Sequence, residues 1–218
     1  VRMIHGIGND ESEEFYDRAY YESGPQTGKS LYQNYRWIPE LTIPLAHHIV
    51  SYTNIHKSRT IMDFGCAKGY LVHALRLIGR QAFGVDISGY AISQAPKEVN
   101  GHVREIEPYT DNFKECDLLL AKDILEHIPY DHIVEQMNVL RSRCHYIFAI
   151  IPLAENGKYI IPAYELDKSH FIREDKQWWI KIFQDAGFSN FKATTDLGPF
   201  KANWQEVDSK GNLLIYGY

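Results

Sequence analysis

Two glycines and two carboxylates between residues 61 and 86 have the types and spacing of a turn that binds a nucleotide-like ligand. The segment IMDFGCAKGYL, residues 61–71, places a strand pattern, a glycine turn and a helix pattern in that order. Gly65 and Gly69 let the backbone bend tightly and approach a ligand closely, and the free N–H groups of the next helix can bind an anionic group. Ala67 occupies the middle of the turn, so neither the dinucleotide fingerprint G-x-G-x-x-G nor the phosphate-binding sequence G-x-x-x-x-G-K-[ST] is present.

The two acidic residues indicate which ligand the turn prefers. Asp63 lies just before Gly65, where a carboxylate would repel a pyrophosphate but could bind a cationic amine. Asp86 falls 17 residues beyond Gly69, at the end of the second strand pattern, and can accept hydrogen bonds from both hydroxyls of a ribose. Ile87 follows it and can cover one face of an adenine. These residues favour a nucleoside that carries an amine over NAD.

The elements that must position these residues follow from a regular alternation of apolar runs and helical patterns. Continuous apolar strands separated by helices are typical of a parallel sheet that is covered on both faces. Strands are predicted at residues 59–65, 81–87, 102–107, 116–123, 145–152, 188–195 and 213–218. Helices are predicted at residues 70–77, near 90–94, at 131–143 and at 175–186, where Gly187 provides a C-terminal cap.

The N-terminal quarter of the chain is predicted to cover the ligand. Residues 12–21 form a short helix that Ser12 caps, and the aromatic-rich residues 22–37 form a loop that packs onto the protein. Pro39 begins a helix that extends to about residue 54. We therefore predict a helical and loop cap at residues 1–58 and one compact domain at residues 59–218.

Composition excludes several classes of function. The net charge is −5, and no stretch rich in Lys and Arg is present, which argues against a nucleic-acid partner. Cys66, Cys116 and Cys144 are odd in number and lack the C-x-x-C spacing, so disulfides and a zinc knuckle are not expected. No apolar run approaches the length of a membrane-spanning helix. We predict a cytoplasmic protein without a membrane association, and the sequence leaves its oligomeric state open.

Four further segments extend the pattern beyond the glycine turn and support a resemblance to a known family. DFGCAKG and GVDIS are similar to the first glycine-rich motif and the following acidic loop of class I S-adenosylmethionine (SAM)-dependent methyltransferases. CDLLLAKDILEHI, HYIFAIIP and FQDAGF resemble later motifs of that family, in the same order, between residues 60 and 218. The resemblance implies a Rossmann-like three-layer α/β sandwich whose seven-stranded sheet is mostly parallel, with the last strand antiparallel. It also implies SAM as cofactor and S-adenosylhomocysteine as product.

The resemblance also implies which residues bind the cofactor. Asp86 and Ile87 would hold the nucleoside, and Glu105, Glu107 and Asp111 are all candidates to recognise the adenine amino group. Tyr35 and Arg36 would close the pocket from the N-terminal side, with Arg36 paired to the methionine carboxylate. The alternative is a packed surface loop with Arg36 in solvent. The residues expected around the methionine and the sulfonium are Asp63, Gly65, Cys66, Ala67, Gly69, Ala121, Lys122 and Asp123.

The acceptor side of the site is less determined by the sequence. If the acceptor is a hydroxyl, a general base assists methyl transfer, and His170 or His127 is predicted for this part, with Asp123 as orienter or alternative base. The alternatives are a backbone-bonded histidine at a helix start for His127 and a surface-loop histidine for His170. Asp123 alone is too little for a metal site, so no metal is predicted.

We predict methylation of a hydroxyl on a sugar or small metabolite. An N-methyltransferase of a small molecule and a catalytically silent SAM-binding partner protein remain open, and a nicotinamide-dependent oxidoreductase is disfavoured by Asp63 and the altered glycine pattern.

Overall fold

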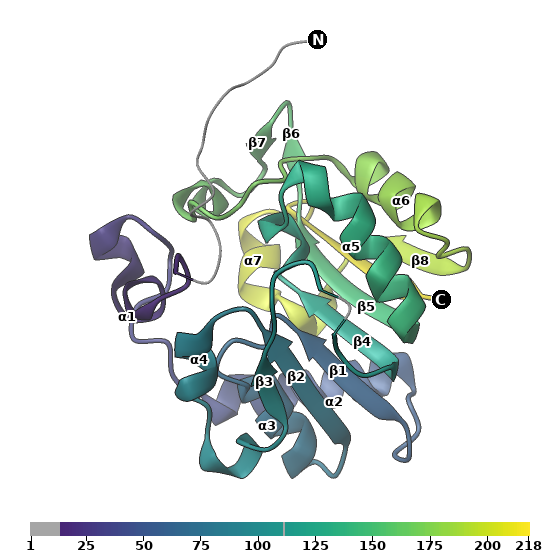
Figure 1. Ribbon diagram of the computed structural model, residues 1–218. Coiled ribbons are helices and arrows are strands. Elements are labelled where there is room, and N and C mark those ends of the chain that lie inside the picture. The colour runs from purple at the N-terminus through teal and green to yellow at the C-terminus, as the bar shows by residue number, and fades with distance from the viewer. Residues whose placement is uncertain (1–13, 111) are drawn as a thin grey trace.

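A sheet of seven strands forms the centre of the computed structural model, which describes residues 14–110 and 112–218 (Figure 1). The strand order is β3-β2-β1-β4-β5-β9-β8. The first five strands run parallel to one another, and β9 runs antiparallel to both β5 and β8. This topology confirms the predicted fold class. The strands are β1 (Thr60–Phe64), β2 (Gln81–Asp86), β3 (Val103–Glu105), β4 (Cys116–Lys122), β5 (Cys144–Pro152), β8 (Phe191–Thr194) and β9 (Asn212–Gly217).

Alternation along β4 shows how the two faces of the sheet are buried. Leu119 and Ala121 pack on one face with α5 (Tyr130–Arg143) and α6 (Lys176–Asp185). Leu118 and Leu120 pack on the other face with α2 (Pro39–Thr53) and α3 (Tyr70–Leu77). Both faces are therefore covered, which explains why the central strands are continuous apolar runs.

Short polar signals set where several helices begin. The side chain of Asp175 accepts a hydrogen bond from the Trp178 N–H at the start of α6, and Ser88 does the same for Ala91 in α4 (Gly89–Ser93). The loops contain four short 3₁₀ helices, a small hairpin and one further helix. These are η1 (Lys97–Val99), η2 (Leu125–His127), η3 (Pro162–Leu166), η4 (Gly198–Phe200), β6 (Ala154–Glu155), β7 (Lys158–Tyr159) and α7 (Ala202–Val207).

The N-terminal segment differs from the prediction in its helix. The predicted cap Ser12 lies outside the described residues, and α1 (Arg18–Thr27) instead begins after Asp17, whose side chain accepts the Tyr20 N–H at 3.0 Å. The helix also runs into residues predicted as a loop. Ser23 leaves the helical conformation, and the resulting kink accommodates the ring of Pro25, which would clash with the preceding turn of a regular helix.

The N-terminal segment is bound to the rest of the protein at two places, the turn after β1 and the segment after η3. The ammonium of the buried Lys68 forms an ion pair with Glu22 and donates a hydrogen bond to the Tyr35 carbonyl at 2.8 Å. The hydroxyl of Tyr20 donates to the Asp167 carboxylate at 2.8 Å, on the segment after η3. Figure 1 shows α1 beyond α4, outside the three layers of the sandwich. Helix α2 belongs to one of the two helical layers. The predicted domain boundary at residue 59 stays a prediction.

No helix in residues 14–110 and 112–218 has both the length and the apolar composition needed to cross a bilayer.

Gly65, which follows β1, is expected to be far less replaceable than Gly79, although both have a φ of +77°. A Cβ on Gly65 would lie 2.5 Å from Ile124 Cγ1, while one on Gly79 would meet nothing within 4 Å. Gly79→Ala should destabilise the fold by about 1 kcal/mol through backbone strain alone. Gly65→Ala should cost about 1–3 kcal/mol more because of overpacking. Denaturant unfolding of both variants measures the difference, and equal losses would refute the steric argument.

Candidate active site

A cavity of about 440 Å³ opens at the carboxyl ends of β1, β2 and β4. Its volume lies within the range of roughly 300–1,000 Å³ that is usual for small-molecule sites. One wall comes from the turn after β1 and the end of β2, and another from residues between Asp123 and Gln136. The N-terminal segment covers the cavity with four tyrosines, namely Tyr16, Tyr20, Tyr21 and Tyr32.

Asp86 is fixed against the glycine turn by backbone hydrogen bonds. Its Oδ2 accepts the N–H of Ala67 at 2.7 Å, and its Oδ1 accepts the N–H of Ser88 at 2.8 Å. Burial raises the pKa of Asp86 to about 6, and these backbone N–H groups limit the rise. Each oxygen retains capacity for a further hydrogen bond. Gly65 and Ala67 line the cavity on one side of this carboxylate, and Ile87 lines it on the other.

Asp63 is a buried carboxylate beneath the same turn. Burial, together with the charge of Asp86, raises the pKa of Asp63 to about 7, and the Lys122 ammonium partly opposes this rise. Within the described part of the chain, no N–H or O–H donates a hydrogen bond to this carboxylate. A buried acid without a donor is unfavourable unless a cationic or donor group of a ligand supplies one. Asp63 does not line the cavity, so its predicted contact with an ammonium group stays a prediction.

The other predicted cofactor residues do not line the cavity. Cys66 is buried and Gly69, with a φ of +72°, leads into α3. Lys122 forms an ion pair with Asp123, and Tyr35 is half-buried against Lys68. Arg36 is exposed to solvent and is not brought to the cavity. The cofactor-binding roles of all the predicted residues, those that line the cavity included, stay predictions.

The cavity has an apolar and aromatic wall formed by the segment after β3. Ile106, Pro108 and Tyr109 line it, and the ring of Tyr109 stacks on His132 with centroids 4.1 Å apart. Among the predicted acidic candidates, Glu105 packs beside Gly89, and Asp111 lies outside the described residues.

His127 lines the cavity and has a tautomer that its partners determine. Its Nδ1 lies 2.8 Å from Ser169 Oγ, and this hydroxyl donates to Asp167 Oδ1 at 2.6 Å. Because a carboxylate only accepts, the single hydroxyl proton points to Asp167, and Nδ1 of His127 must be the donor to Ser169. Nε2 therefore has a lone pair. Burial lowers the pKa of His127, which keeps the ring neutral near pH 7.

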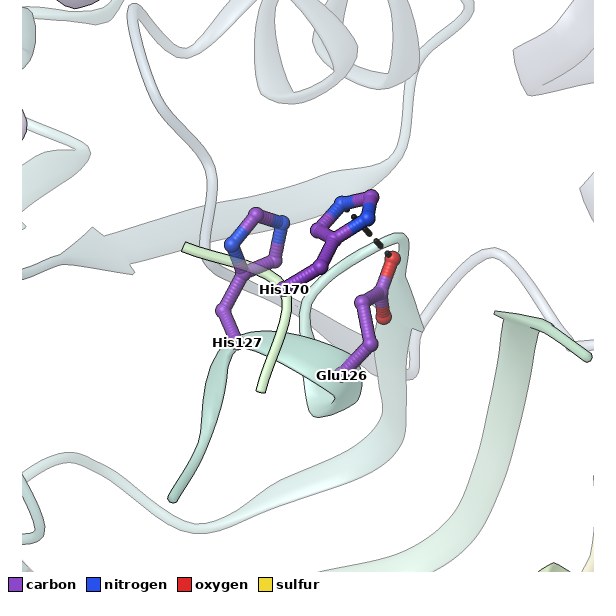
Figure 2. Close-up of side chains that lie close together, drawn as sticks. All are labelled: Glu126, His127 and His170. Atoms are coloured by element: carbon purple, nitrogen blue, oxygen red, sulfur yellow. Dashed lines mark ion pairs between the residues drawn. The ribbon is translucent and has the colours of Figure 1, made fainter. Parts of the chain in front are cut away.

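His170 lies behind His127 and does not line the cavity. The two rings meet edge to face with centroids 4.6 Å apart (Figure 2). Nδ1 of His170 donates to the Tyr164 carbonyl at 2.9 Å, so its Nε2 also has a lone pair. Burial and the neighbouring His127 lower the pKa of His170 to about 3. Its access to an acceptor is therefore poorer than that of His127.

Asp123 reaches the cavity as an ion-paired group. Its backbone has a φ of +54°, and its carboxylate contacts the ammonium groups of Lys122 and Lys201, the latter at 2.5 Å. These two charges hold its pKa well below the usual range despite its burial. A carboxylate of this kind is a weak base, and the part of Asp123 as orienter or alternative base stays a prediction.

The sequence did not predict the residues that orient His127, or the buried acid beside it. Asp167 and Ser169 lie in a segment for which no role was predicted, although the run D-K-S-H places them beside His170. Glu126, which is 1% exposed, occurs in the motif CDLLLAKDILEHI, but no role was predicted for it.

The sheet with its antiparallel β9, the glycine turn and the two carboxylates at the strand ends together define a class I SAM-dependent methyltransferase. The chain belongs to the methyltransferase domain family, whose model matches residues 45–193. SAM is accordingly the cofactor, and the cavity at the ends of β1 and β2 has the volume of a small-molecule site.

Solved structures agree with this fold. A SAM-dependent methyltransferase from Archaeoglobus fulgidus aligns with a TM-score of 0.62 at 17% identity, over 83% of this chain and 94% of its own. A chain in the Haloferax volcanii complex of the Trm112 methyltransferase activator with a methyltransferase aligns with a TM-score of 0.65 at 16% identity, over 94% and 97%. Human N-acetylserotonin methyltransferase, solved with SAM, gives 0.55 at 15% identity, over 72% and 46%. None of the curated proteins matches the chain.

Proposed function

We propose that this methyltransferase transfers the methyl group of SAM to a hydroxyl of a small polar acceptor, such as a sugar or a hydroxylated metabolite. The observation that supports this most directly is the lone pair of His127 Nε2, which Ser169 and Asp167 orient at the cavity wall. A hydroxyl oxygen is a weak nucleophile until its proton is withdrawn, whereas a neutral amine has a lone pair of its own. An oriented ring nitrogen that can take up a proton or bind a cation assists a hydroxyl more than an amine. His127 Nε2 therefore favours methylation of oxygen over methylation of nitrogen.

The two carboxylates at the strand ends would place the cofactor for this reaction. When bound, SAM supplies an activated methyl group on a positively charged sulfur. Asp63 would hold its ammonium group, Asp86 would accept hydrogen bonds from the ribose hydroxyls, and Ile87 would contact the adenine. The chain's remaining task is to hold the acceptor oxygen in line with the methyl group and to exclude water.

The tyrosine wall supports a small hydroxylated acceptor. Tyr16, Tyr20 and Tyr21 line the cavity, and amphipathic aromatic side chains suit a molecule with both polar and apolar surfaces. The acidic net charge of −5 opposes a polyanionic substrate. We therefore place the acceptor between this wall and His127.

The purified chain should transfer labelled methyl from SAM to at least one member of a panel of free sugars, nucleotide sugars and small alcohols. Mass spectrometry and NMR of the product should locate the label in a methyl ether. Matched amino sugars and simple amines serve as the controls. Label found only on nitrogen would overturn the proposal, and binding of S-adenosylhomocysteine without any transfer would support a silent SAM-binding protein instead.

A further inference from the structure

Three side chains with metal-binding atoms converge behind the cavity wall. Glu126 and His127 come from η2, and His170 comes from the segment after η3. One ligand atom from each of them lies within 4.8 Å of the other two. Figure 2 shows the two imidazole rings side by side and the carboxylate of Glu126 directed at His170. The group joins residues 44 positions apart in the sequence, so the tertiary fold alone creates it.

Glu126 is a buried acid without a partner. Its side chain is 1% exposed, and neither carboxylate oxygen has a hydrogen-bond partner within the described part of the chain. The Nε2 of His170 lies 3.9 Å from Oε1, which is too far for a hydrogen bond. Buried carboxylates are nearly always hydrogen-bonded, paired or bound to a metal. Glu126 thus faces a position that a proton or a cation would stabilise.

Both histidines have a ring nitrogen with a lone pair, and one ligand atom of each lies within 4.8 Å of the others and of Glu126. His170 donates its Nδ1–H to the Tyr164 carbonyl, and His127 donates its Nδ1–H to Ser169, which in turn is held by Asp167. Each ring therefore has an unprotonated Nε2. Histidines that ligate metals almost always hold their other ring N–H on a carbonyl or carboxylate in this way, because that contact fixes the tautomer and the ring orientation.

The surrounding cationic side chains do not form a hydrogen bond with Glu126. The ammonium groups of Lys122 and Lys201 are both paired with Asp123, and the Arg173 guanidinium is paired with Glu165. The charges of Lys122 and Lys201 act on Glu126 only from a distance, and neither of its carboxylate oxygens has a hydrogen-bond partner in the described surroundings.

We propose that Glu126, His127 and His170 bind one divalent transition-metal cation through one carboxylate oxygen and two Nε2 atoms. Two imidazoles and one carboxylate suit cations such as Mn²⁺, Fe²⁺, Co²⁺ or Zn²⁺. Neighbouring ligand atoms of a tetrahedral ion are about 3.4 Å apart, given metal–ligand distances of about 2.1 Å. The separation of 3.9 Å between His170 and Glu126 must therefore shorten by about half an ångström. A pair at the widest separation, 4.8 Å, must shorten by about 1.4 Å, which requires rotation of the side chains.

The cation would also explain why His127 lies at the junction of the metal group and the cavity. Coordination positions left open by three protein ligands can take an acceptor hydroxyl, and metal coordination lowers the pKa of that hydroxyl. The hydroxyl proton would then pass to water. The acceptor oxygen would form a bond to the methyl carbon of SAM as the carbon–sulfur bond breaks, and S-adenosylhomocysteine, a neutral thioether, would leave. This catalytic role rests on the proposed hydroxyl methylation, whereas the binding of the cation does not.

Direct metal binding tests the site on the full chain. Chelator-treated protein should bind about one equivalent of Mn²⁺ with micromolar affinity in calorimetry and in electron paramagnetic resonance titrations. Mg²⁺ should bind more weakly, because it prefers an all-oxygen shell. Crystals soaked in Mn²⁺ should give an anomalous peak between the three ligand atoms. Absence of both uptake and the peak for Mn²⁺, Co²⁺ and Zn²⁺ would overturn the proposal without any variant.

Two substitutions separate this site from other binding positions. Glu126→Gln keeps the side-chain shape and His170→Ala removes one imidazole, and each should weaken Mn²⁺ binding at least about 10-fold to 100-fold. His132→Ala, which alters another cavity histidine, should bind Mn²⁺ like the wild type. Circular dichroism verifies that each variant folds, and Mn²⁺ binding undiminished in both folded ligand variants would refute the assignment.

The activity assay distinguishes failure of the metal site from failure of the proposed function. Full methyl-ether formation in excess chelator would refute a catalytic cation and leave hydroxyl methylation intact, with His127 as a direct base. Stoichiometric Mn²⁺ binding without methylation of any hydroxyl in the panel would refute the proposed function and leave the metal site intact.

Discussion

Replacement of Asp86 by alanine is expected to weaken the binding of S-adenosylhomocysteine by at least about 100-fold, since two charge-assisted hydrogen bonds of about 1.5–3 kcal/mol each would be lost. The carboxylate is held by the N–H groups of Ala67 and Ser88, so it needs no rearrangement to accept the two ribose hydroxyls. Calorimetry with S-adenosylhomocysteine at neutral pH measures the loss, because this product requires no acceptor.

Asp117→Ala provides the matched control for Asp86. This aspartate lies near the start of β4, where it accepts hydrogen bonds from Arg59 and Thr60. The cavity lies at the opposite ends of the strands. Its removal should affect stability without altering the affinity for S-adenosylhomocysteine. Equal affinity losses in the two variants would mean that Asp86 acts only through folding, and an unchanged affinity in Asp86→Ala would exclude it from the ribose site.

His127→Ala is expected to lower the rate of methyl transfer by about 10²–10⁴-fold, the range that a positioned acid or base contributes. Withdrawal of the acceptor proton depends on its Nε2, whether that atom takes the proton itself or binds a cation that makes the hydroxyl more acidic. The affinity for S-adenosylhomocysteine should remain close to that of the wild type, because the ring does not contact Asp63 or Asp86 in the described structure. Single-turnover kinetics with the acceptor identified in the panel gives the rate.

Ser169→Ala tests whether the orientation of His127 matters. Ser169 is a positioning residue, and loss of its hydroxyl should reduce the rate by about 10-fold to 100-fold while the acceptor still binds. Ser169→Thr, which retains a hydroxyl, should restore much of the rate. His145→Ala, at an exposed position near the start of β5, should have no effect. A wild-type rate in His127→Ala would remove this residue from the mechanism.

Most of the sheet and its helices could be predicted because buried parallel strands have an unmistakable pattern. Helix α3 (Tyr70–Leu77) has the predicted bounds, and β4 and β5 differ from the prediction by one residue at one end. The predictions were too long where apolar residues serve another purpose. Ile106 was assigned to a strand but lines the cavity, and Phe188 packs in the core beside α6 before β8 begins.

The cofactor side of the site was predictable because its residues are close in sequence and have characteristic turn chemistry. Asp63, Gly65, Ala67 and Asp86 lie within one strand–turn–helix–strand unit. The acceptor side could not be predicted in this way. Asp167 and Ser169 follow β5, the hairpin and η3 in the chain, and only the tertiary fold brings them to His127. Polar residues in a loop give no sign of such a contact. The lack of a hydrogen-bond partner for the Glu126 carboxylate likewise depends on burial, which the local sequence does not reveal.

The close approach of Gly65 to Ile124 has a consequence for how the enzyme can diversify. These residues follow neighbouring strands whose ladder pairs Asp63 with Leu120, so the backbone spacing of the sheet fixes how close the turn after β1 lies to the segment after β4. Exchanging the tyrosines of the N-terminal segment would alter one wall of the cavity while this spacing stays constant. Evolution or engineering can therefore reshape the cavity from the N-terminal side alone.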